Sequence, residues 1–179
     1  MDIKLLVKIS ARAWSLDILA QMYRGVPGRQ AALLSATQAG RTAFSKSLAH
    51  LVELGLVERN PGHGHPLRPE YRLTDTGKIA AAMADRVLQV PVPAPQVGLL
   101  RRAWTLPVLA VSGRPKFFSE IKVSLPAITD RALSQSLKSL QGLEWLRRDV
   151  LPEVHPPRAI YQAVSTGADI SAALEVGQM

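Results

Sequence analysis

The side chains best suited to chemistry in this sequence are hydrogen-bond donors that recur at helical spacing. Between residues 41 and 50, charged and polar side chains alternate with the apolar Phe44 and Leu48, so a helix here would collect the polar groups on one exposed face. Groups of this kind donate hydrogen bonds to base edges and to phosphate oxygens. The candidate contacts on this helix are Arg41, Thr42, Ser45, Lys46 and His50.

A second predicted helix, residues 130–142, has a similar polar face of different composition. Arginine can donate two hydrogen bonds to guanine and glutamine can pair with adenine, whereas serine and threonine are less selective. Asp130 opens this face and adds a negative charge to it. We therefore expect two unlike reading surfaces, the second formed by Arg131, Ser134, Gln135 and Lys138.

Basic residues also gather at two predicted hairpins, where they could bind phosphate groups. An exposed hairpin is often basic, and the repeated His-Pro-x-Arg pattern could reflect common ancestry alone, but a phosphate role is the better interpretation. The candidates in the first hairpin are Arg59, His63, His65 and Arg68. Those in the second are Arg148, His155 and Arg158.

Other kinds of chemistry find little support. His63 and His65 could offer two imidazoles to a metal, but the sequence places no acid or third histidine beside them. The chain has no cysteine, which excludes disulfides, thiol catalysis and cysteine-ligated zinc. No paired carboxylates, Ser-His-Asp set or glycine-rich phosphate loop is recognisable. We expect neither an enzyme nor a bound cofactor.

The sequence repeats itself after about ninety residues. Arg12–Ala20 returns as Arg102–Ala110 with six of nine residues identical, and the two later blocks follow in the same order. Residues 42–59 return as 131–148, and residues 65–77 return as 155–167. Collinear blocks of this kind indicate a duplicated unit of about 85 residues.

The bulk composition fits two small basic units. The chain has 179 residues, is 47% hydrophobic and carries a net charge of +8, divided as +5 before residue 96 and +3 after it. Basic charge favours a polyanionic partner. No stretch reaches the roughly 18 apolar residues of a membrane span, and the N-terminus lacks a secretory signal. We expect a cytoplasmic protein without a membrane partner.

Periodicity predicts the same series of elements in each copy. A helix over residues 3–23 is followed by helices near 28–36 and 41–54, strands at 56–59 and 69–74, and a helix from residue 75. In the second copy the helices fall near 98–112, 116–124, 130–142 and 167–176, and the strands near 145–149 and 158–164. Three prolines between residues 89 and 96 predict an extended linker. The expected domains are residues 1–90 and 98–179, joined by residues 91–97.

Three helices, a two-stranded hairpin and a last helix make a winged helix-turn-helix. The fold class is therefore α+β, mainly α, with this domain present twice. The same elements carry recurring motifs: Trp14-x-Leu16-x-Ile18-Leu19, Leu51-x-x-Leu54-Gly55-Leu56-Val57-x-Arg59 and Pro69-x-Tyr71-x-Leu73-Thr74-x-x-Gly77. Together they resemble the HxlR-type branch of the bacterial MarR-related winged-helix regulators.

The resemblance implies a regulator that binds double-stranded DNA, and it also shows where this chain departs from the family. Family members usually hold one such domain and pair two chains, and many use a cysteine for thiol sensing, which is excluded here. The second copy has Glu144 in place of Gly55 and Val164 in place of Thr74. Its helix end and wing are therefore expected to differ in detail.

Our leading hypothesis is a transcriptional regulator in which two fused domains read an imperfect palindrome. The alternative is an interaction or assembly module without sequence-specific DNA binding, since fold does not fix function. The modest charge of the second copy and Asp130 at the start of its third helix favour this alternative for that half. Trp14 and Trp104 are expected to anchor the core or an interface. Whether a homodimer forms in addition to the pseudo-dimer within one chain is left open.

Overall fold

The computed structural model describes residues 2–60, 69–151 and 157–174 of the chain. These residues fall into two compact units. The first unit is Lys8–Gln89, and the second combines Met1–Val7 with Val90–Met179. In the described part of the chain, no helix is long and apolar enough to cross a membrane.

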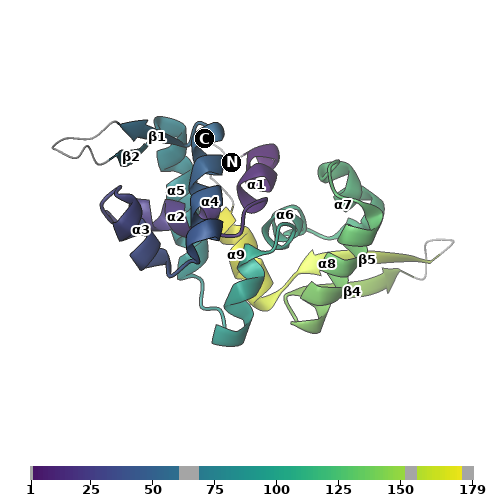
Figure 1. Cartoon of the computed structure of the whole chain (residues 1–179). Coiled ribbons are helices and arrows are strands. Elements are labelled where there is room, and N and C mark those ends of the chain that lie inside the picture. The colour runs from purple at the N-terminus through teal and green to yellow at the C-terminus, as the bar shows by residue number, and fades with distance from the viewer. Residues whose placement is uncertain (1, 61–68, 152–156, 175–179) are drawn as a thin grey trace. The chain divides into compact units, whose positions relative to one another are not determined.

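The first unit is built around a helix-turn-helix and a short wing. Helix α2 packs against α5, α3 and α4, and the side chains of Leu19, Leu33, Phe44 and Met83 are fully buried among them. The hairpin formed by β1 and β2 projects from these helices (Figure 1). The elements of this unit are α2 (Ser15–Tyr23), α3 (Gln30–Thr37), α4 (Arg41–Glu53), β1 (Val57–Asn60), β2 (Glu70–Leu73) and α5 (Asp75–Gln89). Helix α1 (Ile3–Ser10) is divided between the units, and only its last residues, 8–10, belong to this one.

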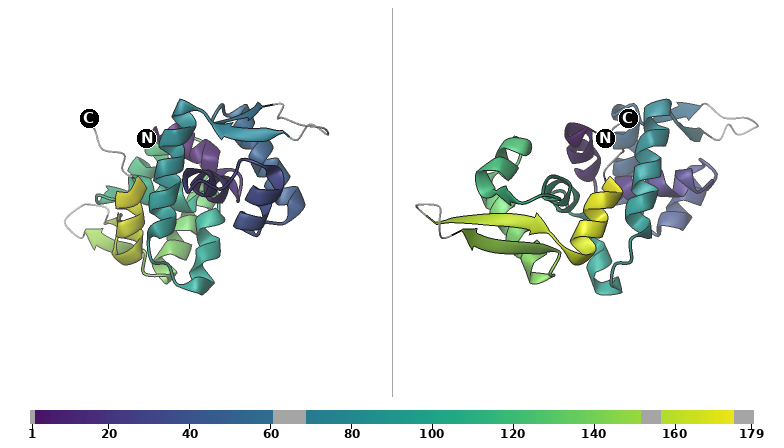
Figure 2. Two further views of the ribbon diagram at one scale, coloured as in Figure 1. Left: turned by 90° about the vertical axis from the view of Figure 1, so that its left-hand side faces the viewer. Right: turned by 180° about the vertical axis from the view of Figure 1, so that it is seen from behind.

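The second unit repeats this order. Helix α6 packs against α9, α8 and α7, and the core contains Leu109, Ile121, Leu133 and Trp145. Figure 2 shows the hairpin of β4 and β5 extending away from the helices of its unit. The elements are a 3₁₀ helix η1 (Ala94–Arg101), α6 (Thr105–Val111), β3 (Lys116–Phe117), α7 (Phe118–Ser124), α8 (Asp130–Gly142), β4 (Leu146–Leu151), β5 (Arg158–Ala163) and α9 (Ser165–Leu174).

The two wings pair their strands in the same register. Arg59 lies opposite Tyr71 in the first wing, and Arg148 lies opposite Tyr161 in the second. The second unit has the expected two-stranded wing of β4 and β5, and a further strand that was not predicted, β3, pairs with β5 to give a sheet in the order β3-β5-β4. Strand β3 is only two residues long, which is too short for an alternating pattern to identify.

The structure also corrects the first helix and the linker. The predicted helix over residues 3–23 is interrupted between α1 and α2, where turn hydrogen bonds such as Ser15 N–H to the Arg12 carbonyl replace the helical pattern. The second unit breaks at the same Arg-Ala-Trp sequence, between η1 and α6. The apolar stripe continues across each break, so periodicity does not reveal it. The linker is not extended throughout, because η1 begins at Ala94.

Each wing is fastened to the following helix by a backbone contact at a glycine. The Leu56 carbonyl accepts a hydrogen bond from Thr74 N–H at 3.1 Å, and a Cβ atom on Gly77 would lie 1.8 Å from the same oxygen. In the second unit the Trp145 carbonyl accepts from Val164 N–H at 3.0 Å, and a Cβ on Gly167 would lie 2.0 Å from that oxygen. Only a residue without a side chain fits at this joint.

Helices α4 and α8, which carry the two polar faces predicted to read DNA and are called the reading helices below, end in the same backbone conformation although the residues at that position differ. Gly55 has a φ of +67° and Glu144 a φ of +58°, both left-handed. The following amide bonds back to the helix in each case, Leu56 N–H to the Leu51 carbonyl and Trp145 N–H to the Leu140 carbonyl, both at 3.0 Å. Glu144 therefore adopts the same left-handed conformation as Gly55, which is sterically unfavourable for a residue with a Cβ atom.

We expect Glu144→Gly to stabilise the second unit by about 0.5–1 kcal/mol, because glycine adopts the left-handed conformation without steric cost. The matched reverse change, Gly55→Ala, should destabilise the first unit by a similar amount. Urea unfolding of the full chain, followed by circular dichroism, measures both. If the Glu144→Gly protein is no more stable than the parent, the left-handed conformation of Glu144 is not strained.

Candidate nucleic-acid interface

Helix α4 separates an apolar face from a polar one. The side chains of Phe44 and Leu51 are fully buried, and they turn the opposite face of the helix outward. The N-cap residue of α4, Gly40, has no side chain to cap the helix, and the first helical hydrogen bond runs from Phe44 N–H to the Gly40 carbonyl. Four of the predicted contacts of this helix are exposed together: Arg41, Thr42, Ser45 and Lys46.

His50 does not lie with these four side chains. Its side chain is 19% exposed, its Nε2 atom lies 2.8 Å from the Lys8 carbonyl oxygen of α1, and its Nδ1 atom lies 3.9 Å from a carboxylate oxygen of Glu53. The structure thus directs His50 toward α1. Lys8 is 42 residues away in sequence, so the helical wheel alone does not reveal this contact.

Helix α8 exposes all four of its predicted contacts: Arg131, Ser134, Gln135 and Lys138. The opposite face, with Leu133 and Leu137, is buried. Thr129 caps the helix by accepting a hydrogen bond from Ala132 N–H at 3.2 Å. The sequence reasoning missed Lys122 of α7, whose Nζ atom lies 3.0 Å from Asp130 Oδ1.

The wings present an arginine at matching positions. Arg59 and Arg148 are both exposed, and each stands beside a tyrosine of the neighbouring strand. Four other predicted wing contacts lie outside the described residues: His63, His65, Arg68 and His155.

Arg158 is exposed but already engaged within its unit. Its Nη2 atom donates to Ser119 Oγ at 3.3 Å, and its guanidinium lies 4.7 Å from the centre of the Phe117 ring. These contacts hold Arg158, the first residue of β5, against β3 and α7. They come from residues about forty positions earlier, which sequence spacing could not indicate.

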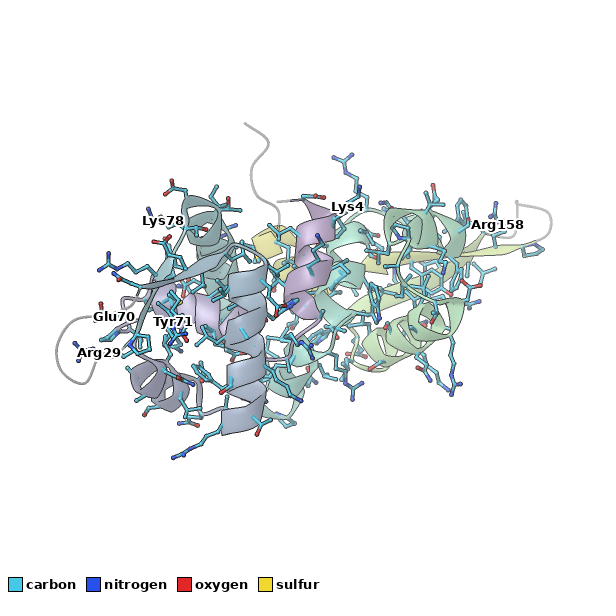
Figure 3. The ribbon with its side chains drawn as sticks, turned by 45° about the horizontal axis from the view of Figure 1, so that its top comes forward. Lys4, Arg29, Glu70, Tyr71, Lys78 and Arg158 are labelled. Atoms are coloured by element: carbon cyan, nitrogen blue, oxygen red, sulfur yellow. The ribbon has the colours of Figure 1, made fainter. Side chains whose placement is uncertain are left out.

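The first wing has a comparable anchor that was also not foreseen. Arg29 Nε lies 3.4 Å from a carboxylate oxygen of Glu70, and Arg72 Nη2 lies 4.0 Å from the other. Figure 3 shows Arg29 and Glu70 together at the outer side of the wing base, with Tyr71 nearer the helices. Both anchors connect the wing to the start of the first helix of the helix-turn-helix, α3 in the first unit and α7 in the second.

An open pocket of about 390 Å³ lies between α3, α4 and the wing of the first unit. It connects the reading face of α4, through Ser45, with the wing arginine Arg59. The two predicted contact surfaces of this unit are therefore continuous. The lining residues are Gln30, Ser45, Leu48, Ala49, Val52, Glu53, Arg59 and Tyr71.

The charges of this interface are the exposed cations of α4, α8 and the wings, together with the exposed carboxylate of Asp130. Within the described ranges, no group of three histidine, aspartate or glutamate residues could hold a metal ion. A hydrogen bond from Lys78 to Asp75 lowers the pKa of that carboxyl and raises the pKa of the amine, but both residues belong to α5 and not to α4 or the wing. The exposed groups of α4 and α8 can bind a polyanion by hydrogen bonding and charge.

Comparison with known proteins identifies the family of this chain. The profile of the HxlR-like helix-turn-helix family matches residues 9–90 and again residues 99–178. The HTH-type transcriptional regulator YodB of Bacillus subtilis (strain 168) is 33% identical over 78 residues, which cover 43% of this chain and 69% of that protein.

Two solved structures are also similar. The reduced form of YodB from B. subtilis shares 32% identity, with a TM-score of 0.40, over 44% of this chain and 76% of that one. A MarR-family protein from Porphyromonas gingivalis W83 shares 28% identity, with a TM-score of 0.35, over 37% of this chain and 66% of that one. Because the family profile matches twice and spans most of the sequence, the chain belongs to the HxlR-like helix-turn-helix family and carries two tandem copies of its domain.

Proposed function

We propose that the protein is a transcriptional regulator that binds double-stranded DNA with both winged-helix units and acts in the cytoplasm. The observation that carries the proposal is the presence, in each unit, of a reading helix with an exposed polar face and a wing with an arginine in the same register. A helix of this kind fits the major groove, where its N-terminal half reaches base edges. The differing faces of α4 and α8 favour an imperfect palindrome as the operator.

Selection of bound fragments from a random duplex pool, followed by mobility shifts at low salt, tests this proposal. We expect an enriched sequence with two related half-sites. The absence of binding to any duplex at low salt would overturn it. An affinity for a protein partner that survives high salt, without DNA binding, would instead support the assembly module.

Salt should weaken the binding strongly, because each neutralised phosphate releases counterions. We expect the double variant Arg59→Gln/Arg148→Gln to reduce the slope of log K against log salt by about 2, roughly 1 for each phosphate contact. Lys78→Gln is a suitable control, since this side chain is ion-paired with Asp75 on α5. An unchanged slope in the double variant would show that the two wing arginines do not contact phosphates.

The number of chains on one operator follows from the same proposal. Two units in one chain supply two reading helices, so one chain is sufficient for one palindrome. We expect a single chain per duplex, which mass measurement of the complex in solution can check. Two chains per operator would mean that the units pair between chains.

A further inference from the structure

The two reading helices begin with side chains of opposite charge. Arg41 is the first residue of α4 and Asp130 the first residue of α8, and both are exposed. The buried Phe44 and Leu133 that follow three residues later show that the helices are aligned at this position. The same place in the two units therefore carries a guanidinium in one and a carboxylate in the other.

The structure holds Asp130 at this place through Lys122. The Lys122 Nζ atom lies 3.0 Å from Asp130 Oδ1 and also donates a hydrogen bond to the Ile128 carbonyl in the turn before α8. The side chain of Lys122 is 33% exposed, whereas that of Asp130 is 78% exposed. The amine is thus bound to the turn, and the carboxylate faces solvent with oxygen lone pairs to spare.

The first unit has neither the acid nor the lysine. Leu33 of α3 and Ile121 of α7 are both fully buried and mark equivalent positions, so the residue after each corresponds as well. Lys122 then matches Leu34, which carries no charge. Within the described part of the chain, no ion pair engages Arg41. The acid and the lysine that holds it are thus both particular to the second unit.

A carboxylate and a guanidinium select different base edges. A carboxylate only accepts hydrogen bonds, and in the major groove the donors are the amino groups of cytosine and adenine, of which cytosine is the usual partner of aspartate. Arginine instead donates two bonds to guanine. A carboxylate that finds no amino group remains near phosphates of like charge, which weakens binding to every other sequence.

We propose that Asp130 is a specificity determinant that selects a cytosine in the half-site of α8, where Arg41 selects a guanine in the half-site of α4. The operator then departs from a perfect palindrome at this position, because the two half-sites carry the base pair in opposite orientations. Arg41 increases the affinity for any duplex, whereas Asp130 lowers the affinity for duplexes that lack the cytosine at this position. This inference rests on the DNA-binding function proposed above.

The test compares duplexes that carry each of the four base pairs at this position of the α8 half-site. We expect the parent protein to prefer cytosine by roughly five- to a hundredfold, as one good base contact permits. Asp130→Asn should lose most of this preference and bind the other three duplexes roughly three- to thirtyfold more tightly. Asp130→Arg should shift the preference to guanine.

Asp169→Asn on α9 is the matched control, because it removes the same charge from an exposed position outside the reading helix. It should change each affinity less than twofold. Thermal unfolding checks that Asp130→Asn remains folded, which its exposure favours. If the parent binds its operator and Asp130→Asn leaves the base preference unchanged, or weakens binding to every duplex, this inference is wrong while the proposed function stands. If the parent binds no duplex, both are overturned.

Discussion

Alanine in place of Gly77 is expected to destabilise the first unit by on the order of 3 kcal/mol, since a new Cβ atom in a packed backbone contact forces the chain apart. The added atom would lie 1.8 Å from the Leu56 carbonyl oxygen, which belongs to the backbone and has no rotamer to change. The hydrogen bond from Thr74 N–H to the same oxygen would be lost with it. Gly167→Ala should act in the same way on the second unit, where the Trp145 carbonyl is 2.0 Å from the new atom.

Urea unfolding of the full chain measures both effects. Gly142→Ala is the control, because a Cβ atom at this position of α8 meets nothing within 4 Å. That substitution should be neutral or slightly stabilising, as alanine is favoured in helices. A Gly77→Ala protein as stable as the control would show that the wing and α5 can separate without loss.

The double variant Arg41→Ala/Arg131→Ala is expected to lose roughly 2–6 kcal/mol of specific binding free energy, at about 1–3 kcal/mol for each arginine. Both side chains are exposed near the N-terminal end of a reading helix, where base edges come within reach. Each single variant should lose discrimination in one half-site only. Titration of the selected operator, and of duplexes with one half-site scrambled, measures these losses.

His50→Ala provides a contrast within the same helix. This side chain is directed to the Lys8 carbonyl, so its loss should affect stability more than base discrimination. If His50→Ala and Arg41→Ala reduce discrimination equally, the exposed face of α4 does not define the contact surface. Circular dichroism of each variant separates a loss of folding from a loss of contacts.

Much of the fold could be predicted because local pattern and tertiary structure agree. The family, the tandem copies and the mainly helical winged fold are confirmed, and α8 spans the predicted residues 130–142. Strong amphipathic periodicity and a cap at Thr129 specify this helix locally. The repeat helped further, since weak signals in one copy were clearer in the other.

The errors arose where nonlocal contacts decide the structure. Strand β3 exists because β5 pairs with it, and the breaks before α2 and α6 do not interrupt the apolar stripe. In the interface, the orientation of His50 and the anchoring of Arg158 by Phe117 and Ser119 depend on residues about forty positions away. The DNA contacts themselves stay predictions. For the candidates among the described residues, the structure shows which side chains are exposed and which lie together.

The glycine joint has a consequence for how this protein could be rebuilt. Because Gly77 and Gly167 lock the wing to the last helix through the same backbone contact, the boundaries of the segment between the joint and the reading helix are equivalent in the two units. The segment from α4 through β2 should therefore be exchangeable with that from α8 through β5. Under the function proposed above, such a transplant would create chains with two like DNA-reading surfaces, which we expect to prefer symmetric operators.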